Sequence, residues 1–241
     1  MNRHAGRLTA GLAGCLAIVL AGCGAAGTSS QTTPRPATNG VENQTTRPAT
    51  NGLESQTAAQ VARAANTALK AAASVHVRGT FYTAHRTENF NLRYEGGSAS
   101  GKFTVNGAPI KVIAAGGSAY LKAGQRGWQA MGNPDTAGLP VNQWVRVGSA
   151  RQTLAPFSLA TLASELTAEE SAHGGAGTVK QSMLAGHRVV VVTFPDGSKL
   201  SVANIGTAYP LRFDDTGAVG SRAFSEYGAA FHITAPPSAG H

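Results

Sequence analysis

Cysteine is almost absent from this chain of 241 residues, and both cysteines, Cys15 and Cys23, lie close to its N-terminus. Cys15 falls inside a segment that we expect to be removed on export, which leaves Cys23 as the single thiol of the mature chain. A disulfide within the mature protein is thereby excluded. Small exported domains often depend on disulfides, so this one has to depend on a sizeable hydrophobic core.

Charge is also scarce, because only 13% of the residues are charged. Without Arg3 and Arg7, which lie in the expected leader, 18 basic and 12 acidic residues remain, a net charge of +6. The basic residues are scattered along the chain and do not cluster on one helix or loop, as a phosphate-tracking patch would. Nucleic acid is therefore not expected as a partner, and a diffuse positive surface facing anionic lipids or cell wall is the better interpretation.

The residue patterns that usually carry catalysis are missing. The histidines of the expected folded domain are far apart and form no His-x-x-x-His pair, which argues against a zinc site; they are His76, His85, His173, His187 and His232. There is no Gly-x-Ser-x-Gly elbow and no glycine-rich phosphate loop that follows a strand and opens a helix. We therefore expect no catalytic residue, no metal and no cofactor, and a hydrolase is only a weak third hypothesis.

The N-terminus carries the most specific pattern. A short basic stretch, residues 1–7, precedes an apolar run over residues 8–21, which is too short for a membrane-spanning helix and fits a signal peptide. The run ends in Leu20-Ala21-Gly22-Cys23, which resembles the bacterial lipobox. The resemblance implies cleavage after residue 22 and a diacylglycerol on the Cys23 thiol. The alternative is an ordinary signal peptide in which Cys23 is incidental.

Two or three acyl chains such as palmitate on one cysteine anchor a protein stably, where a single chain is marginal. The expected location is therefore the extracytoplasmic face of the cell membrane. No internal stretch approaches the ~20 apolar residues that a membrane-spanning helix needs.

Residues 23–56 are polar and are expected to form a flexible tether. Within them a twelve-residue unit, residues 35–46, is repeated at once over residues 47–58. Its prolines and Asn-Gly pairs break regular elements, and it is too polar to bury a core. A flexible chain of this length spans roughly 30 Å on average, which would hold a folded domain near the membrane.

Residues 57–237 are expected to form one folded domain, followed by a tail over residues 238–241. Apolar residues recur at helical spacing over residues 57–73 and again after Pro156. Alternating apolar and polar residues, with Gly-rich turns about every ten residues, predict an antiparallel meander. The expected strands are 75–82, 89–94, 103–105, 110–112, 119–121, 144–147, 178–184, 187–194, 199–203, 209–213, 222–227 and 231–234. This order predicts an α+β fold with a single curved antiparallel sheet, an open half-barrel, and helices packed on its concave face.

The layout resembles the LolA-like fold, and most closely the LppX/LprG type of mycobacterial cell-envelope lipoproteins. The segments that carry the resemblance are residues 74–81, 117–122, 144–147, 209–213 and 224–228, with Trp128 and the Pro236-Pro237 end. The resemblance implies an apolar cavity that holds the acyl chains of a lipid or lipoglycan. It transfers no binding residue, because the cavity of this family is defined by shape and apolarity.

Two roles remain open for the large apolar side chains of the predicted strands and second helix. They could line a lipid cavity or fill a closed core, and the alternation pattern does not separate the two. The candidates are Phe81, Phe90, Leu92, Val112 and Leu162. A lipid-binding or lipid-presenting lipoprotein is the leading hypothesis, and a lipoprotein that docks an envelope protein or senses the envelope without lipid cargo is the alternative.

Overall fold

The computed structural model describes the backbone of residues 48–83, 86–132, 138–149, 158–172, 175–216, 220–237 and 239–240. It describes the backbone but not the side chains of residues 81–83, 86–87, 165, 167–172 and 239–240. The chain divides into two units, Met1–Thr45 and Thr46–His241, and the described residues belong to the second. The expected leader and Cys23 lie outside the described residues, as do His85 and His173.

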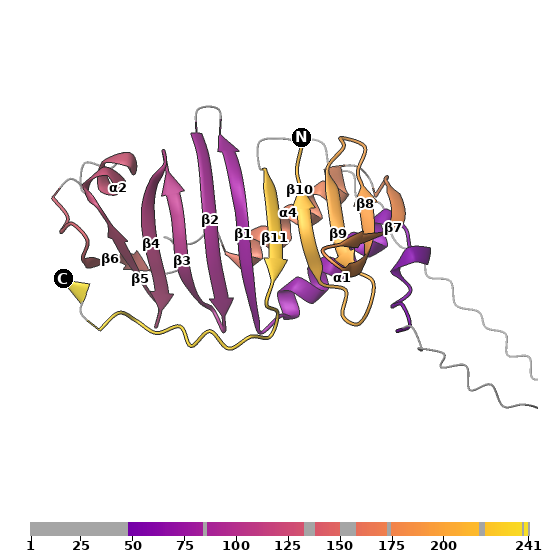
Figure 1. Cartoon of the computed structure of the whole chain (residues 1–241), viewed down its shortest axis with the longest axis horizontal. Coiled ribbons are helices and arrows are strands. Elements are labelled where there is room, and N and C mark those ends of the chain that lie inside the picture. The colour runs from indigo at the N-terminus through magenta and orange to yellow at the C-terminus, as the bar shows by residue number, and fades with distance from the viewer. Residues whose placement is uncertain are drawn as a thin grey trace, which may run out of the picture. The chain divides into compact units, whose positions relative to one another are not determined.

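One mixed sheet runs through the whole described domain (Figure 1). Its strands, in chain order, are β1 (Ser74–Thr83), β2 (Arg86–Glu95), β3 (Ser98–Val105), β4 (Ala108–Ala115), β5 (Ser118–Ala123), β6 (Trp144–Ser149), β7 (Thr178–Leu184), β8 (His187–Thr193), β9 (Lys199–Ala203), β10 (Pro210–Asp214), β11 (Ser221–Ser225) and β12 (Ala239–Gly240). They lie in the order β12-β6-β5-β4-β3-β2-β1-β11-β10-β9-β8-β7, so the sheet is open at both edges. All neighbours are antiparallel except the two-residue β12, which pairs with β6 in parallel.

The helices lie on one face of this sheet, which we call the inner face (Figure 1). The helix α1 (Ala58–Ala71) begins with a capping box, in which the Thr57 side chain accepts from the Gln60 amide and the Gln60 side chain accepts from the Thr57 amide. It packs against α4 (Leu159–Ala172) and contacts β8, β9 and β10. The short α2 (Gln125–Ala130) contacts β3, β4 and β5.

Alternation along each strand separates the core from solvent. On β4, for example, Ile110, Val112 and Ala114 are buried on the inner face, whereas Lys111 between them is exposed on the outer face. The inner faces of β1–β5 and β8–β11 join the buried faces of α1 and α4 in one hydrophobic core. The predicted α+β fold, with one curved antiparallel sheet and helices on its concave face, is therefore confirmed.

Three local features differ from the sequence prediction. Residues 231–234 form no strand; they belong to an extended segment that follows β11. This segment is anchored by single bonds, such as that from the Gly228 amide to the Ser74 carbonyl, and not by a ladder. The helix α2 was not predicted, because six residues around Gly127 are too few to show a helical period. Asn66 is buried on α1, although the helical spacing of the apolar residues over residues 57–73 predicts it on the opposite, solvent-facing side.

Residues before the expected start of the domain also pack against it. Leu53 is buried in the core, on a short 3-10 helix, Leu53–Ser55. The Asn51 amide donates to the Asn204 carbonyl at 3.1 Å, and its side chain donates to the carbonyls of Ala203 and Gly206. The packed region therefore begins before Thr57, within the second copy of the repeat.

Candidate functional site

A cavity with a volume of about 740 Å³ lies at one end of strands β2–β5. Its walls come from the C-terminal end of α1, the β2–β3 turn, the end of β4 and the start of α4. The lining residues are Lys70, Ala72, Ala73, Tyr94–Ala99, Ala114, Gly117 and Ser158–Thr161. Small-molecule sites commonly enclose ~300–1,000 Å³, and this volume lies within that range.

Small side chains create this space. Tyr94, Ala99 and Ala114 are buried deep in the cavity, and the two alanines lie directly opposite each other on β3 and β4. Alanine at both positions leaves room that a leucine pair would fill. The rim carries the exposed turn glycines and the exposed ammonium of Lys70. The cavity thus has an apolar interior and a polar rim with one basic side chain, Lys70, and one acidic side chain, Glu95.

The cavity also contains titratable and hydroxyl groups. Burial raises the pKa of the Tyr94 phenol far above its ordinary value, so this group stays neutral at physiological pH. At the rim, the Ser158 hydroxyl accepts from the Thr161 amide at 3.1 Å and so caps α4. Among the described residues, no group of three or more His, Cys, Asp or Glu side chains could hold a metal ion.

None of the described side chains proposed from the sequence as cavity lining borders this cavity, and one of them, Phe90, borders a smaller hollow beside Gly79. Phe90, Leu92, Val112 and Leu162 all belong to the buried core, and the side chain of Phe81 lies outside the description. The lining role of these residues stays a prediction. The residues that do line the cavity were not predicted. The sequence feature that could have indicated them is the frequency of alanine and glycine where strands β2–β5 reach their turns.

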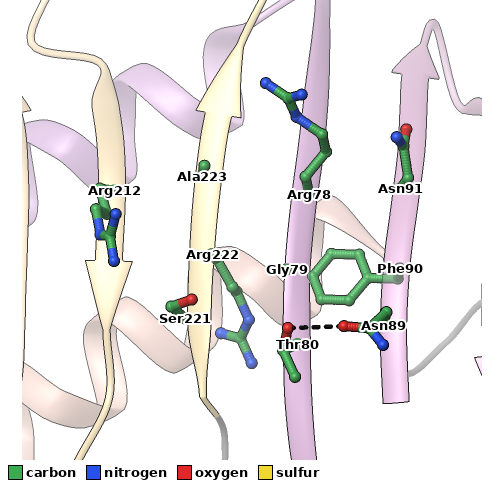
Figure 2. A pocket seen from close by; sticks show the side chains of 10 residues that line it. All are labelled: Arg78, Gly79, Thr80, Asn89, Phe90, Asn91, Arg212, Ser221, Arg222 and Ala223. Carbon is green, nitrogen blue, oxygen red and sulfur yellow. Dashed lines mark hydrogen bonds between the residues drawn. The ribbon is translucent and has the colours of Figure 1, made fainter. Parts of the chain in front are cut away.

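A second, smaller hollow of about 310 Å³ lies beside Gly79 (Figure 2). On the outer face, Arg78 on β1 and Arg212 on β10 lie on either side of Ala223 on the strand between them. Gly79 has room only for hydrogen, because the ring of Phe90 on β2 and the Ser221 carbonyl would lie 2.6 Å from a Cβ there. Arginine side chains make the hollow basic, and the amide side chains of Asn89 and Asn91 lie along its other side.

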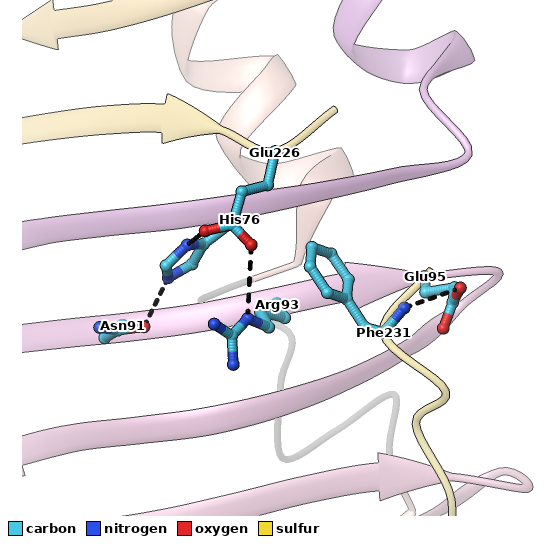
Figure 3. Close-up of polar contacts among 6 residues, drawn as sticks. All are labelled: His76, Asn91, Arg93, Glu95, Glu226 and Phe231. Atoms are coloured by element: carbon cyan, nitrogen blue, oxygen red, sulfur yellow. Dashed lines mark hydrogen bonds and ion pairs between the residues drawn. The ribbon is translucent and has the colours of Figure 1, made fainter. Parts of the chain in front are cut away.

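A polar cluster at the start of β1 and the end of β2 holds the C-terminal segment on the outer face (Figure 3). His76 is buried, and its ring nitrogens lie 2.7 Å from Glu226 Oε1 and 2.6 Å from Asn91 Oδ1. Arg93 lies 3.8 Å from the other oxygen of Glu226 and stacks over the Phe231 ring, 5.5 Å from its centroid. The Phe231 amide donates to the carboxylate of Glu95 at 3.2 Å.

This cluster predicts a stability change in acid. The hydrogen bond to His76 and the charges of His76, Arg93 and Arg78 hold the pKa of Glu226 below its ordinary value of 4.5. A lowered pKa in the folded state gives a stabilisation that is fully present above pH 4.5 and is lost as the pH falls through the lowered value. We expect the urea concentration at which half of the protein is unfolded to be lower at pH 3.5 than at pH 6. The decrease should be smaller in Glu226→Gln, which has no carboxylate to protonate at this position. Glu88→Gln serves as the control for loss of one carboxylate; equal acid sensitivity in all three proteins would contradict the prediction.

Comparison with known proteins gives a likeness of structure only. No protein-family model matches the sequence, and no curated protein matches it. LprF from Mycobacterium bovis matches the structure with a TM-score of 0.50 and 15% identity, over 74% of this chain and 96% of that one. The lipoprotein LppX from Mycobacterium tuberculosis matches with a TM-score of 0.44 and 13% identity, over 73% of this chain and 98% of that one.

The MucA/MucB complex from Pseudomonas aeruginosa contains a more distant match, with a TM-score of 0.33 and 16% identity over 72% of this chain and 58% of that one. The match to LprF covers almost all of that protein and most of the described sheet and helices here. The chain therefore has the fold of LprF, and the LppX/LprG-type half-barrel predicted from the sequence is confirmed as its fold.

Proposed function

We propose that this chain is an exported protein, anchored to the extracytoplasmic face of the cell membrane through lipid on Cys23, that binds a lipid or lipoglycan and carries or presents it. The observation that carries the proposal is the cavity of about 740 Å³ between α1, α4 and the ends of β2–β5. Within the described residues no helix is long and apolar enough to cross a membrane, and the lipobox-like sequence at Cys23 supplies a different means of attachment.

The chemistry of the cavity matches a ligand with an acyl chain and a charged head. The interior around Ala99, Ala114 and Leu159 offers apolar surface to hydrocarbon, whose burial provides most of the binding free energy. Lys70 at the rim offers an ammonium to a phosphate or carboxylate in the headgroup. The sequence resemblance to the LppX/LprG type implies the same class of ligand.

The direct test is mass spectrometry of lipid retained by residues 46–241, the compact unit. The protein is produced behind a cleavable signal in a lipid-rich host, purified without detergent, and extracted with organic solvent. We expect one lipid class at close to one molecule per protein. A lipid-free protein that also takes up none of the lipid added to it would refute the proposal.

A cavity-filling variant locates the ligand. Ala114 is 1% exposed and faces the cavity from β4, so the ring in Ala114→Phe should occupy the space of the hydrocarbon. We expect at least tenfold less bound lipid, with a cost in stability of about 1–3 kcal/mol from overpacking. Ala230→Phe, an identical change at an exposed site after β11, is the matched control and should bind as the parent does. Equal lipid content in both variants would place the ligand elsewhere.

One observation favours the alternative, an interaction with an envelope protein. Met183 and Ile205 are exposed, at 59% and 38%, and both border a hollow of about 490 Å³ beside the β7–β8 turn. Exposed apolar side chains that gather in one place often mark protein contacts. Crosslinking in cells from a photoreactive group at Met183 would identify a partner, and the same group at Ser182 is the control.

A further inference from the structure

The basic residues that are scattered in the sequence gather on the outer face of the sheet. Each of six consecutive strands, β1 to β6, places one exposed or half-exposed basic side chain on this face. We call them the outer-face basic patch: Arg78, Arg93, Lys102, Lys111, Lys122 and Arg146. At ~4.8 Å between strands, the patch extends over ~24 Å.

The register brings the lysines into direct opposition. Lys102 on β3 pairs with Lys111 on β4, and Lys111 pairs with Lys122 on β5. Like charges directly opposite each other destabilise an antiparallel sheet. Among the described residues between Ser74 and Ser149 only two are acidic, Glu88 and Glu95, and a third carboxylate, that of Glu226 after β11, lies beside Arg93. None of the three lysines forms an ion pair within the described part of the chain, so an external anion is the available source of neutralisation.

The surroundings of the lysines indicate which kind of anion fits. Ile113 and Tyr120, half-exposed and paired with each other, lie next to the lysines on the same face. Arg78 continues the lysine row through Asn91 and borders the basic hollow of Figure 2. Tyrosine and aliphatic residues among lysines are typical of surfaces at a membrane interface. A site for a single-stranded nucleic acid would instead combine a basic groove with several stacking aromatic rings.

We propose that the outer-face basic patch docks the domain on a bilayer that contains anionic phospholipid. Lysine and arginine contact headgroup phosphates, and Tyr120 and Ile113 contact the interfacial layer. Strands β2–β5 carry both the patch and the mouth of the cavity, because Gly96, Gly97 and Gly117 lie in their turns. The distance along a strand from the patch to the cavity mouth, from Lys102 to Ser98 or from Lys111 to Gly116, is ~13–17 Å. Docking of the patch would therefore bring the mouth of the cavity close to the headgroups. The docking itself does not depend on a lipid in the cavity.

Vesicle binding by residues 46–241 tests the proposal. The probes are vesicles of phosphatidylcholine alone and vesicles with 30% phosphatidylglycerol, at low and high salt. We expect binding to the anionic vesicles only, weakened by salt. Each basic residue near such a surface contributes about fivefold in affinity, so Lys111→Gln with Lys122→Gln should weaken binding about 25-fold. The matched control is Lys180→Gln with Lys199→Gln, which removes the same charge on β7 and β9 and should change binding less than threefold.

Protection from acetylation provides a second readout that needs no variant. Mass spectrometry after brief treatment with an acetylating reagent should show Lys102, Lys111 and Lys122 protected by anionic vesicles, and Lys180 and Lys199 unchanged. Equal protection of all lysines, or equal binding of both double variants, would overturn the proposal. Binding to soluble polyphosphate but not to vesicles would overturn the proposal and would show that the patch binds a linear polyanion and not a bilayer. Ala114→Phe, which fills the cavity, should still bind anionic vesicles as the parent does. Failure of the cavity proposal can therefore be distinguished from failure of the docking proposal.

Discussion

Replacing Leu92 with alanine is expected to lower the free energy of unfolding by about 2–5 kcal/mol. Leu92 is 0% exposed on β2, between Val77 on β1 and Gly101 on β3. Removing its isobutyl group leaves a void that the neighbouring strands cannot close, because both are held in register by their own ladders. Urea denaturation of residues 46–241 at neutral pH measures the change.

The same variant decides between the two roles that the sequence left open for the large apolar residues. As a core residue, Leu92 should affect stability strongly and lipid content little. Leu159, half-buried at the cavity, is the matched comparison. Leu159→Ala should cost less stability and change lipid binding more. If Leu92→Ala instead changed lipid content while stability stayed within 1 kcal/mol of the parent, Leu92 would be a lining residue.

This ambiguity shows why the cavity was harder to predict than the fold. Along β4, Ile110, Val112 and Ala114 share one face and one alternation pattern and all belong to the buried core, yet only Ala114 also borders the cavity. The difference arises from what covers each residue, which is a property of α1 and α4 and not of the strand. In these strands the sequence indicates the cavity through the small size of Ala114 and Ala99.

The strands themselves were predictable because their signals are local. Alternation defines each strand, and turns such as Asn106-Gly107 supply the positive φ angles, 51° and 74°, that a tight hairpin needs. The pairing of β1 with β11 joins residues 76–79 to 222–225 and has no local signal. The extended segment after β11 has strand-like composition at residues 231–234, but it lies outside the ladder and is held by side chains such as Glu95.

The outer-face basic patch was overlooked for a different reason. The basic residues were judged by their separation in the sequence, whereas a hairpin opposes residues that are equidistant from its turn. Folding the chain about Asn106-Gly107 brings Lys102 to Lys111, and folding it about Gly116-Gly117 brings Lys111 to Lys122. The diffuse positive surface expected from the sequence is therefore concentrated on one face.

Replacing Gly101 with alanine is expected to destabilise the domain by about 3 kcal/mol or more, through a combination of backbone strain and close contact. Gly101 on β3 has a φ angle of +154°, a conformation that side-chain-bearing residues rarely adopt. A Cβ there would clash with the backbone carbonyl oxygen of Asn91 on β2 and would lie 3.0 Å from the Leu92 Cα. A carbonyl in a strand ladder cannot rotate away as a side chain can, so β2 and β3 must separate.

Gly107→Ala is the control that isolates the conformational part of this cost. Gly107 also has a positive φ angle, +74°, but no atom lies within 4 Å of its Cβ position, so its replacement should cost only ~1–2 kcal/mol. Urea denaturation of both variants measures the difference. Equal costs at Gly101 and Gly107 would show that the two strands do not approach as closely as described.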